Sequence, residues 1–503
     1  MFQKILVANR GEIAVRIIRA CREMGIASVA VYSEADKEAL HTKLADEAIC
    51  IGPAPSKDSY LSMENIISAT IISGADAIHP GFGFLSENSK FAELCEQCNI
   101  TFIGPDSKVI ASLGNKQVAR NTMMAAGVPV IPGSKEPVYD AKTGAELARE
   151  IGYPVIIKAA LGGGGKGMRT AWTPEEFESA FQTAQKETEM AFADSTMYIE
   201  HFVENPRHIE FQILADKYGN VIHLGERDCS IQRRHQKMIE ESPSPALTDE
   251  IRKKIRSTAV QAAKAVNYES AGTIEFLVDK YRHFYFLEMN TRLQVEHPIT
   301  EEVVGVDLVK EQLHVAGGEA LRFKQEDLFQ RGHAIECRIC AEDTENGFIP
   351  CPGIIRQLTE PNGIGVRIDS YVYEGYEIPL YYDPMIGKLI VWATNRQFAI
   401  ERMRRVLYEF KITGLKTNIS YLRRIMYAPA FVKGEYDTSF LSKYSRSLQR
   451  SNGENEEIEN MAMIAAYVDY LFNLEENSPV RTTDSRPISR WREFGLQKGV
   501  LRI

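Results

Sequence analysis

The sequence predicts an α/β fold that begins with a parallel, doubly wound sheet over roughly the first 110 residues. Two observations support this fold class. Short apolar runs of strand length alternate with stretches of helical period. Further along the chain, strand patterns recur around a glycine-rich segment and dominate again after residue 330. We therefore expect several α/β regions in series.

The predicted elements of the first region follow one another closely. Residues 4–9 (KILVAN) have the pattern of a buried strand. The next stretch carries apolar residues at 13, 17, 20, 21 and 24, the period of a helix, and Gly25 stands near its end. Further apolar runs predict strands at 28–33, 47–52 and 75–81. Because helical stretches separate these strands, the sheet is expected to be parallel.

A second α/β region is expected from Gly114 onward. It contains a predicted hairpin at 161–167, a helix at 174–192, and strands at 207–214, 219–225, 270–278 and 283–289. The strand patterns HAIECRIC and GKLIVWA then precede an amphipathic helix at 397–410. After Lys443 the composition turns polar, which is typical of a linker, and a short apolar helix is predicted at 458–472.

Length and composition limit the class of protein. A chain of 503 residues exceeds the roughly 250–300 at which single cores stop growing, so two to four domains are expected. The net charge of -9 argues against a general nucleic-acid binder. No apolar run approaches about 18 residues, so no transmembrane helix is predicted. The first residues lack a signal-peptide pattern, and the expected compartment is the cytoplasm.

Two C-x-x-C pairs, Cys95/Cys98 and Cys337/Cys340, are candidates for metal ligands. The first pair lies in a helical pattern and the second in a predicted strand, far apart in the chain. A chelating pair in a strand would have poor geometry, because alternate side chains point to opposite faces. We therefore expect buried, small apolar residues in place of a zinc or redox site.

A glycine run suggests a phosphate-binding loop. Lys158 ends a predicted strand shortly before Leu161-Gly-Gly-Gly-Gly-Lys-Gly167. Consecutive glycines let backbone N–H groups close around phosphate oxygens, and lysine adds matching charge. The run is not a P-loop, since Gly167 follows Lys166 where Ser or Thr is required, and no helix opens directly on it as in dinucleotide folds. A flexible surface loop is the alternative.

Carboxylates in two neighbouring strands predict a metal site. Glu275 and Glu288 lie in alternating segments that could form a hairpin, with Asn290 two residues beyond. Their oxygens are hard ligands suited to Mg²⁺ or Mn²⁺ on ATP phosphates. Arg292 and Glu296 follow, and they could position an anionic substrate and remove its proton. Solvated salt bridges are the alternative for each pair.

A third cluster spans 207–212 (RHIEFQ) and 232–237 (QRRHQK). Beside a phosphate site, the second stretch would be an anion-binding loop, whereas alone it would be a solvated turn. His208 and His235 are more suited to binding phosphate or ribose than a metal. No second imidazole or thiolate stands at ligand spacing, so zinc is not supported.

Together these motifs resemble the ATP-grasp superfamily and, within it, the biotin carboxylase family. The similarity covers residues 1 to about 445. Seven segments match in order: KILVANRGEIAVRIIRA, HPGFGFLSEN, KAALGGGGKGMR, ENPRHIEFQ, ERDCSIQRRHQK, FLEMNTRLQVEHPITE and AIECRICAED.

The resemblance implies four parts of the chain. Residues 1–114 would form an N-terminal Rossmann-like domain, and 115–330 an ATP-grasp domain with a mobile lid at about 131–203. Residues 331–446 would form a mixed α+β C-terminal domain. Residues 447–503 would be a linker and extension, which could dock a partner or stabilise the fold.

The resemblance also implies roles for individual residues. ATP would be bound by a set of phosphate, ribose and adenine contacts: Lys116, Lys158, Gly164, Gly165, Glu200, His201, Phe202, Val203, His208, Gln232 and His235. Glu275, Glu288 and Asn290 would hold two Mg²⁺ or Mn²⁺ ions. Bicarbonate would be held by Lys237, Arg292, Gln294 and the Val295 backbone.

The implied reaction is the carboxylation of biotin through carboxyphosphate. Glu296 would act as the base, and Arg338 would stabilise the biotin enolate oxygen by charge-assisted hydrogen bonds. Two positions depart from the family. Phe82 replaces a frequent Tyr, which removes any hydroxyl contact to biotin from that ring. His201 replaces a frequent Lys, which puts a charged contact there in doubt, while backbone contacts to adenine are expected to remain.

The sequence carries no A/V-M-K-M segment for biotin attachment. Biotin is therefore expected on a separate biotin carboxyl carrier protein. The second expected partner is a carboxyltransferase subunit, and the usual family assembly is a homodimer. The final carboxyl acceptor is not predicted. Two alternatives stay open: another ATP-grasp carboxylate–amine ligase, and a catalytically silent ATP-binding subunit. Arg338 and HPGFGF would have no assigned role in the first of these.

Overall fold

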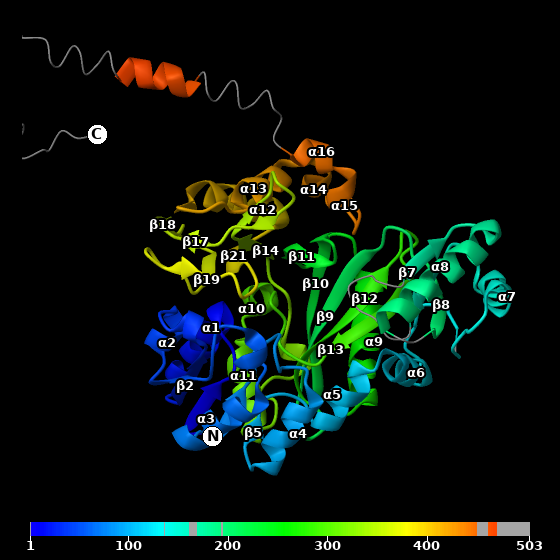
Figure 1. The fold of residues 1–503 in the computed structure, drawn as a ribbon, viewed down its shortest axis with the longest axis horizontal. Coiled ribbons are helices and arrows are strands. Elements are labelled where there is room, and N and C mark those ends of the chain that lie inside the picture. The colour runs from blue at the N-terminus through cyan, green and yellow to red at the C-terminus, as the bar shows by residue number, and fades with distance from the viewer. Residues whose placement is uncertain (1, 135, 160–167, 193–194, 450–460, 470–503) are drawn as a thin grey trace, which may run out of the picture. The chain divides into compact units, whose positions relative to one another are not determined.

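The protein is seen in a computed structural model that describes residues 2–134, 136–159, 168–192, 195–449 and 461–469. It divides into two units, Met1–Leu448 and Gln449–Ile503. Figure 1 shows the first unit as stacked α/β layers, with the N-terminal segment in blue and the large central sheet in green. The glycines at 164 and 165 lie outside the described residues.

The N-terminal sheet is parallel and five-stranded, in the order β3-β2-β1-β4-β5, which confirms the predicted alternation. Ile5 and Val7 pack on one face, and Leu6 and Ala8 on the other, so helices cover both faces. Its elements are β1 Lys4–Val7, α1 Gly11–Glu23, β2 Ala27–Tyr32, α2 Leu40–Leu44, β3 Glu47–Cys50, α3 Met63–Ser73, β4 Ala77–His79, α4 Ser89–Gln97, β5 Thr101–Phe102 and α5 Ser107–Gly114.

The start of α1 depends on Gly11. Its φ is +66°, a left-handed conformation that side chains with a Cβ rarely adopt. A Cβ at this position would also lie 3.5 Å from the Tyr371 ring. The chain therefore turns sharply from β1 into α1, and Glu12 enters the protein interior in the first turn of the helix.

A three-stranded antiparallel sheet, in the order β7-β6-β8, fills most of the segment expected to be a lid. Its elements are α7 Ala141–Ile151, β6 Val155–Ala159, β7 Met168–Ala171, α8 Pro174–Phe192 and β8 Met197–His201. The predicted helix at 174–192 is confirmed. The hairpin predicted at 161–167 lies outside the described residues, and the strands on either side of it, β6 and β7, pair antiparallel.

One eight-stranded antiparallel sheet runs through the rest of the first unit, in the order β13-β12-β9-β10-β11-β14-β21-β19. It crosses residue 330, where the sequence suggested a domain boundary, because β11 pairs with β14. The strands are β9 Arg207–Ala215, β10 Val221–Arg233, β11 Gln236–Ser242, β12 Ser270–Val278, β13 Phe284–Asn290, β14 His333–Cys340, β19 Val366–Ser370 and β21 Met385–Ala393.

Helices and short strand pairs complete this unit. α6 Lys116–Ala125 begins where Asn115 caps the N–H groups of Gln117 and Val118. The other helices are α9 Asp249–Ala265, α10 His297–Val304, α11 Leu308–Ala316, α12 Arg396–Glu409, α13 Ile419–Tyr427, α14 Pro429–Lys433, α15 Phe440–Lys443 and α16 Ser445–Leu448. The short strands are β15 Glu342–Asp343, β16 Ile349–Pro350, β17 Gly353–Ile354, β18 Gln357–Thr359, β20 Glu377–Ile378 and β22 Lys411–Thr413.

In the second unit the structure describes one helix, at 461–469, within the predicted range of 458–472. Its apolar side chains, which include Met461, Ile464 and Tyr467, are exposed. Among the described helices, none has the length and apolar character needed to cross a membrane.

Candidate functional site

A cleft of about 820 Å³ brings together many of the predicted site residues. Its walls come from the start of α1, residues 82–84, the turn between β10 and β11, and residues 381–385. The predicted residues that line it are His235, Lys237, Glu275, Asn290, Arg292, Gln294, Val295 and Arg338. The cleft is therefore built by segments from all three predicted domains of the first unit.

Lys237 lies at the centre of the charged groups. Its Nζ is 2.5 Å from Glu210 Oε2, 2.9 Å from Glu275 Oε1 and 2.7 Å from Glu296 Oε1. Burial alone would lower the pKa of this ammonium, but the three carboxylates outweigh it and hold the pKa well above its ordinary value. Lys237 is therefore a permanent cation that faces the cleft.

Glu296 stands between two cations at the start of α10. Its Oε1 contacts Lys237, and its Oε2 accepts a hydrogen bond of 2.9 Å from Arg338 on β14. Burial raises the pKa of this carboxyl, but the charges of Lys237, Arg338 and Arg227 outweigh burial and hold the pKa well below its ordinary value. Glu296 is thus an anion whose basicity depends on its two cationic partners.

Arg338 pairs with carboxylates that lie outside its own strand. Its Nε donates to Glu240 Oε1 at 2.7 Å, and its terminal nitrogen reaches Glu296. Glu240 lies on the neighbouring strand β11, directly opposite Glu336 on β14. The guanidinium is therefore held across strands and aimed at the cleft, not along its own strand.

The two carboxylates predicted to bind metal face each other. Glu275 on β12 and Glu288 on β13 are paired across the antiparallel strands, so their side chains share one face. Asn290 donates to Glu275 Oε1 at 2.9 Å. Glu288 itself is exposed, so a cation has access to this pair.

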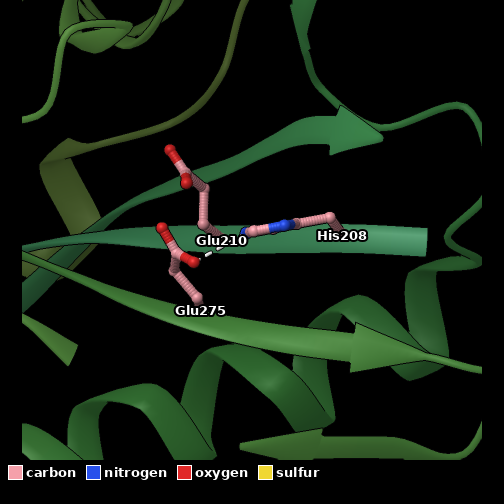
Figure 2. Close-up of side chains that lie close together, drawn as sticks. All are labelled: His208, Glu210 and Glu275. Atoms are coloured by element: carbon pink, nitrogen blue, oxygen red, sulfur yellow. Dashed lines mark ion pairs between the residues drawn. The ribbon is translucent and has the colours of Figure 1, made fainter. Parts of the chain in front are cut away.

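Figure 2 shows a second candidate group, His208, Glu210 and Glu275, whose ligand atoms lie within 4.8 Å of one another. His208 Nε2 is 2.8 Å from Glu275 Oε2. Glu210, however, already accepts from Lys237 and from Arg227 at 2.5 Å. Glu210 is buried between these two cations, whereas Glu288 is exposed to an incoming ion, so the Glu275, Glu288 and Asn290 set fits a divalent ion better. Its donors are all hard oxygens.

Arg292 is held by acceptors on three sides. Its Nε donates to Glu87 at 2.8 Å, and its terminal nitrogens donate to Gln294 and Asn290 at 3.1 Å each. Gln294 in turn donates to Glu275 at 3.3 Å. The planar guanidinium is thus fixed beside the carboxylate pair, in an arrangement suited to a planar anion.

Apart from His235, the described residues expected to bind nucleotide do not line this cleft. Lys158 on β6 forms an ion pair with Glu200 on β8. The His201 ring lies 3.1 Å from the Gly152 carbonyl, and Val203 is buried, while the Phe202 ring packs edge-on against Trp172. Lys116 is exposed at the start of α6, and its charge lowers the pKa of Glu288. Gln232 contacts His208 at 3.2 Å.

Several residues of the network were missed at the sequence level. Glu210 and Arg227 are fully buried, and Arg227 also donates to Gln212 and Thr300. Glu87 and Glu210 stood inside the quoted motifs HPGFGFLSEN and ENPRHIEFQ, so their positions were a usable signal. Lys388 was a further signal, because a lysine interrupts the apolar strand GKLIVWA. Glu240 had no comparable signal.

The four C-x-x-C cysteines form no metal group among the described residues, and all eight cysteines are free. Cys95 and Cys337 are buried. The expectation of burial thus holds for these two, whereas Cys98 and Cys340 are only partly buried.

Comparison with known families covers nearly the whole first unit. Residues 1–110 match "Biotin carboxylase, N-terminal domain", and residues 336–443 match "Biotin carboxylase C-terminal domain". Residues 115–324 match "Carbamoyl-phosphate synthase L chain, ATP binding domain". The three matches follow the order of the sequence and confirm the three-domain α/β fold class.

Two curated relatives are similar over nearly all of their length. The chain is 58% identical over 445 residues to the biotin carboxylase of Nostoc sp., covering 88% of this chain and 100% of that protein. It is 57% identical over 445 residues to biotin carboxylase 1 of Bacillus subtilis, covering 88% and 99% of the two chains.

Solved structures agree. The complex of Campylobacter jejuni biotin carboxylase with β-γ-ATP has a TM-score of 0.84 and 51% identity, covering 88% of this chain and 99% of that one. The biotin carboxylase domain dimer of Hydrogenobacter thermophilus 2-oxoglutarate carboxylase, in complex with MgADP, ADP and bicarbonate, has a TM-score of 0.83 and 49% identity, covering 90% and 100%. The biotin carboxylase subunit of a pyruvate carboxylase has a TM-score of 0.80 and 49% identity, again covering 90% and 100%. This chain belongs to the biotin carboxylase family.

Proposed function

We propose that this chain catalyses the ATP- and bicarbonate-dependent carboxylation of biotin carried on a separate protein. The observation that supports this most is the arrangement around Glu296. The buried carboxylate of Glu296 lies between Lys237 and Arg338, both of which line the cleft, and Arg292 lines the same cleft. Such a site offers a base and convergent cations to small anions.

Bicarbonate would be held by Lys237, Arg292, Gln294 and the backbone of Val295. Glu296 would take its proton as the bicarbonate oxygen attacks the γ-phosphate of ATP, giving ADP and carboxyphosphate. The low pKa of Glu296 in the free protein reflects its ion pairs with Lys237 and Arg338. When these cations turn to the incoming anions, the pKa of Glu296 rises, and the carboxylate becomes a stronger base.

The ATP site would combine the predicted nucleotide residues with a divalent ion. Glu275, Glu288 and Asn290 would hold two Mg²⁺ or Mn²⁺ ions, which neutralise phosphate charge when bound. Lys116 is near enough to Glu288 for its charge to lower the pKa of that carboxyl. Lys158, on the strand that leads into the glycine run, forms an ion pair with Glu200 on β8.

Biotin would enter the same cleft from its other wall. Carboxyphosphate would break down to CO₂ and phosphate, the phosphate would take the N1′ proton of biotin, and the enolate would attack CO₂. Arg338 would stabilise the enolate oxygen, since its guanidinium already points into the cleft. Phe82 lines this wall and supplies an apolar contact without a hydroxyl.

The proposed partners are a biotin carboxyl carrier protein and a carboxyltransferase subunit, with the chain itself as a homodimer. The relatives described as the biotin carboxylase subunit of pyruvate carboxylase and as a biotin carboxylase domain dimer support this assembly. We also propose a cytoplasmic location. Cell fractionation tests that proposal, because some relatives are chloroplastic.

The test of function is an assay of ADP release with Mg²⁺, in the presence and absence of bicarbonate and biotin. We expect ATP cleavage to require bicarbonate, and carboxybiotin to form when biotin or a biotinylated carrier is added. Formation of an acyl phosphate from another acid without bicarbonate would favour a different ATP-grasp ligase. Nucleotide binding without any cleavage would favour the silent ATP-binding subunit.

A further inference from the structure

Lys388 is a lysine buried without solvent exposure in the middle of β21. Lysine is almost never fully buried unless it is paired, because removing its charge from water costs several kcal/mol. Burial lowers the pKa of Lys388, but Glu12 and Asp369 outweigh this and raise the pKa above its ordinary value. The side chain is therefore a buried cation.

The contacts of Lys388 join three parts of the fold. Its Nζ is 3.1 Å from Glu12 Oε2, in the first turn of α1, and 3.8 Å from Asp369 Oδ2 on β19. It also donates a hydrogen bond of 2.9 Å to the carbonyl oxygen of Val295. That carbonyl belongs to the peptide that joins Val295 to Glu296.

A neighbouring cation, Arg338, contacts the side chain of the residue that follows this peptide. Arg338 and Lys388 are directly opposite each other in the β14–β21 pairing, so their side chains lie on one face of the sheet. Arg338 holds the carboxylate of Glu296 at 2.9 Å, while Lys388 holds the backbone just before it. Two adjacent strands thus position residues 295 and 296.

A purely structural ion pair would explain the Glu12 contact but not the bond to Val295. Charge pairing of Lys388 with Glu12 and Asp369 involves only the carboxylates of those two residues. The hydrogen bond to a backbone carbonyl, by contrast, fixes the orientation of one peptide within a loop. A charge-assisted bond of this kind is stronger than a neutral one.

We infer that Lys388 is a positioning residue for bicarbonate: it orients the Val295–Glu296 peptide, with Glu12 and Asp369 as its counterions. This inference rests on the proposed function, because the loop matters through the bicarbonate contact at Val295 and the base at Glu296. Lys388 itself touches no substrate. It acts through Val295 and Glu296, in the loop that leads into α10.

The test is Lys388→Met, which keeps an unbranched side chain of nearly the same length and removes the donor and the charge. Because a hydrogen bond to a charged group contributes about 1.5–3 kcal/mol, we expect the KM for bicarbonate to rise about ten- to hundredfold. The KM for ATP should stay within about twofold, since the polar contacts of Lys388 in the described part of the chain are with Glu12, Asp369 and Val295, none of which is a predicted nucleotide residue.

Glu12→Gln combined with Lys388→Met separates positioning from stability. The single variant leaves Glu12 as a buried carboxylate without its cation, which destabilises the protein. The double variant removes that carboxylate charge, so thermal stability should recover in part. If Lys388 positions the loop, the KM for bicarbonate stays raised in the double variant. The double variant also carries the test if the single one does not fold.

Lys416→Met is the matched control. This lysine belongs to the same predicted domain and pairs with Asp343 at 2.5 Å, but its side chain is 60% exposed. Neither KM should change in it. An unchanged KM for bicarbonate in a folded Lys388→Met protein, or its return to normal in the double variant, would overturn the inference. Failure of the wild-type protein to cleave ATP with bicarbonate would instead reject the proposed function.

Discussion

Replacing Arg338 with glutamine separates the chemistry of biotin from that of ATP. In the structure, this guanidinium bonds to two fully buried carboxylates, Glu240 and Glu296. If it also stabilises the biotin enolate, its loss should remove biotin carboxylation while leaving most bicarbonate-dependent ATP cleavage. Glu296 keeps its contact with Lys237 at 2.7 Å, so the base is not released from the site.

The magnitudes of the two effects differ. Loss of one donor to a developing oxyanion costs about 2.7–4 kcal/mol, so carboxylation should fall about 10²- to 10³-fold. Breaking a buried pair destabilises a protein by about 3–5 kcal/mol, and the glutamine amide offsets part of this through its remaining donor. ATP cleavage should stay within about tenfold, as expected for a group that acts on Glu296 only indirectly.

The assay measures both activities on one folded preparation, with free biotin to exclude effects on a carrier. Arg396→Gln is the matched control, because Arg396 also bonds to a buried carboxylate, Glu241 at 2.6 Å, but does not line the cleft. It should lower stability without changing the ratio of the two activities. A constant ratio in Arg338→Gln as well would refute the assignment and leave Arg338 with a structural role alone.

Further predictions concern the base, a buried acid and the metal. Glu296→Gln should keep ATP affinity but lower turnover about 10²- to 10⁴-fold, and near-normal turnover of the folded variant would place the base elsewhere. Burial and the Glu240 charge raise the pKa of Glu336 well above its ordinary value of 4.5, so the unfolded chain loses this proton at lower pH than the folded protein does. The wild-type protein should therefore lose stability relative to Glu336→Gln as the pH rises above 4.5. A constant difference in stability between the two proteins from about pH 4 to 8 would contradict this. A chelator should abolish ATP cleavage, with recovery by Mg²⁺ or Mn²⁺, and Glu288→Gln should raise the Mg²⁺ concentration required, whereas metal-independent cleavage would reject the site.

Much of the fold was predictable because its local patterns are strong. The helix at 174–192 and the strand at 270–278 have the predicted bounds, and the parallel N-terminal sheet follows from strand–helix alternation. The joining of β11 to β14 was not predictable. Hydrophobic period shows where a strand lies, but pairing between strands far apart in the chain is decided by tertiary packing.

The site was predictable where chemistry and motif coincided. The pairing of Glu275 with Glu288 followed from two alternating segments that form a hairpin. The pairing of Arg338 with Glu240 could not be predicted from the sequence. Glu336 is near Arg338 in the sequence, but Glu240 is near it in space. Roles for the glycines at 164 and 165 stay predictions, since they lie outside the described residues.

The concentration of buried charge in the cleft has a physical explanation in the proposed reaction. In the proposed reaction, Lys237 and Arg338 must be charged to bind bicarbonate and the enolate oxygen. Burial without counterions would lower the pKa of a cation or destabilise the fold. Carboxylates such as Glu210 and Glu240 keep them charged in the free protein. The same two cations hold the pKa of Glu296 low until substrate anions compete for them. In the proposed reaction, substrate binding would thereby be coupled to the strength of the base, and premature proton uptake by Glu296 would be suppressed.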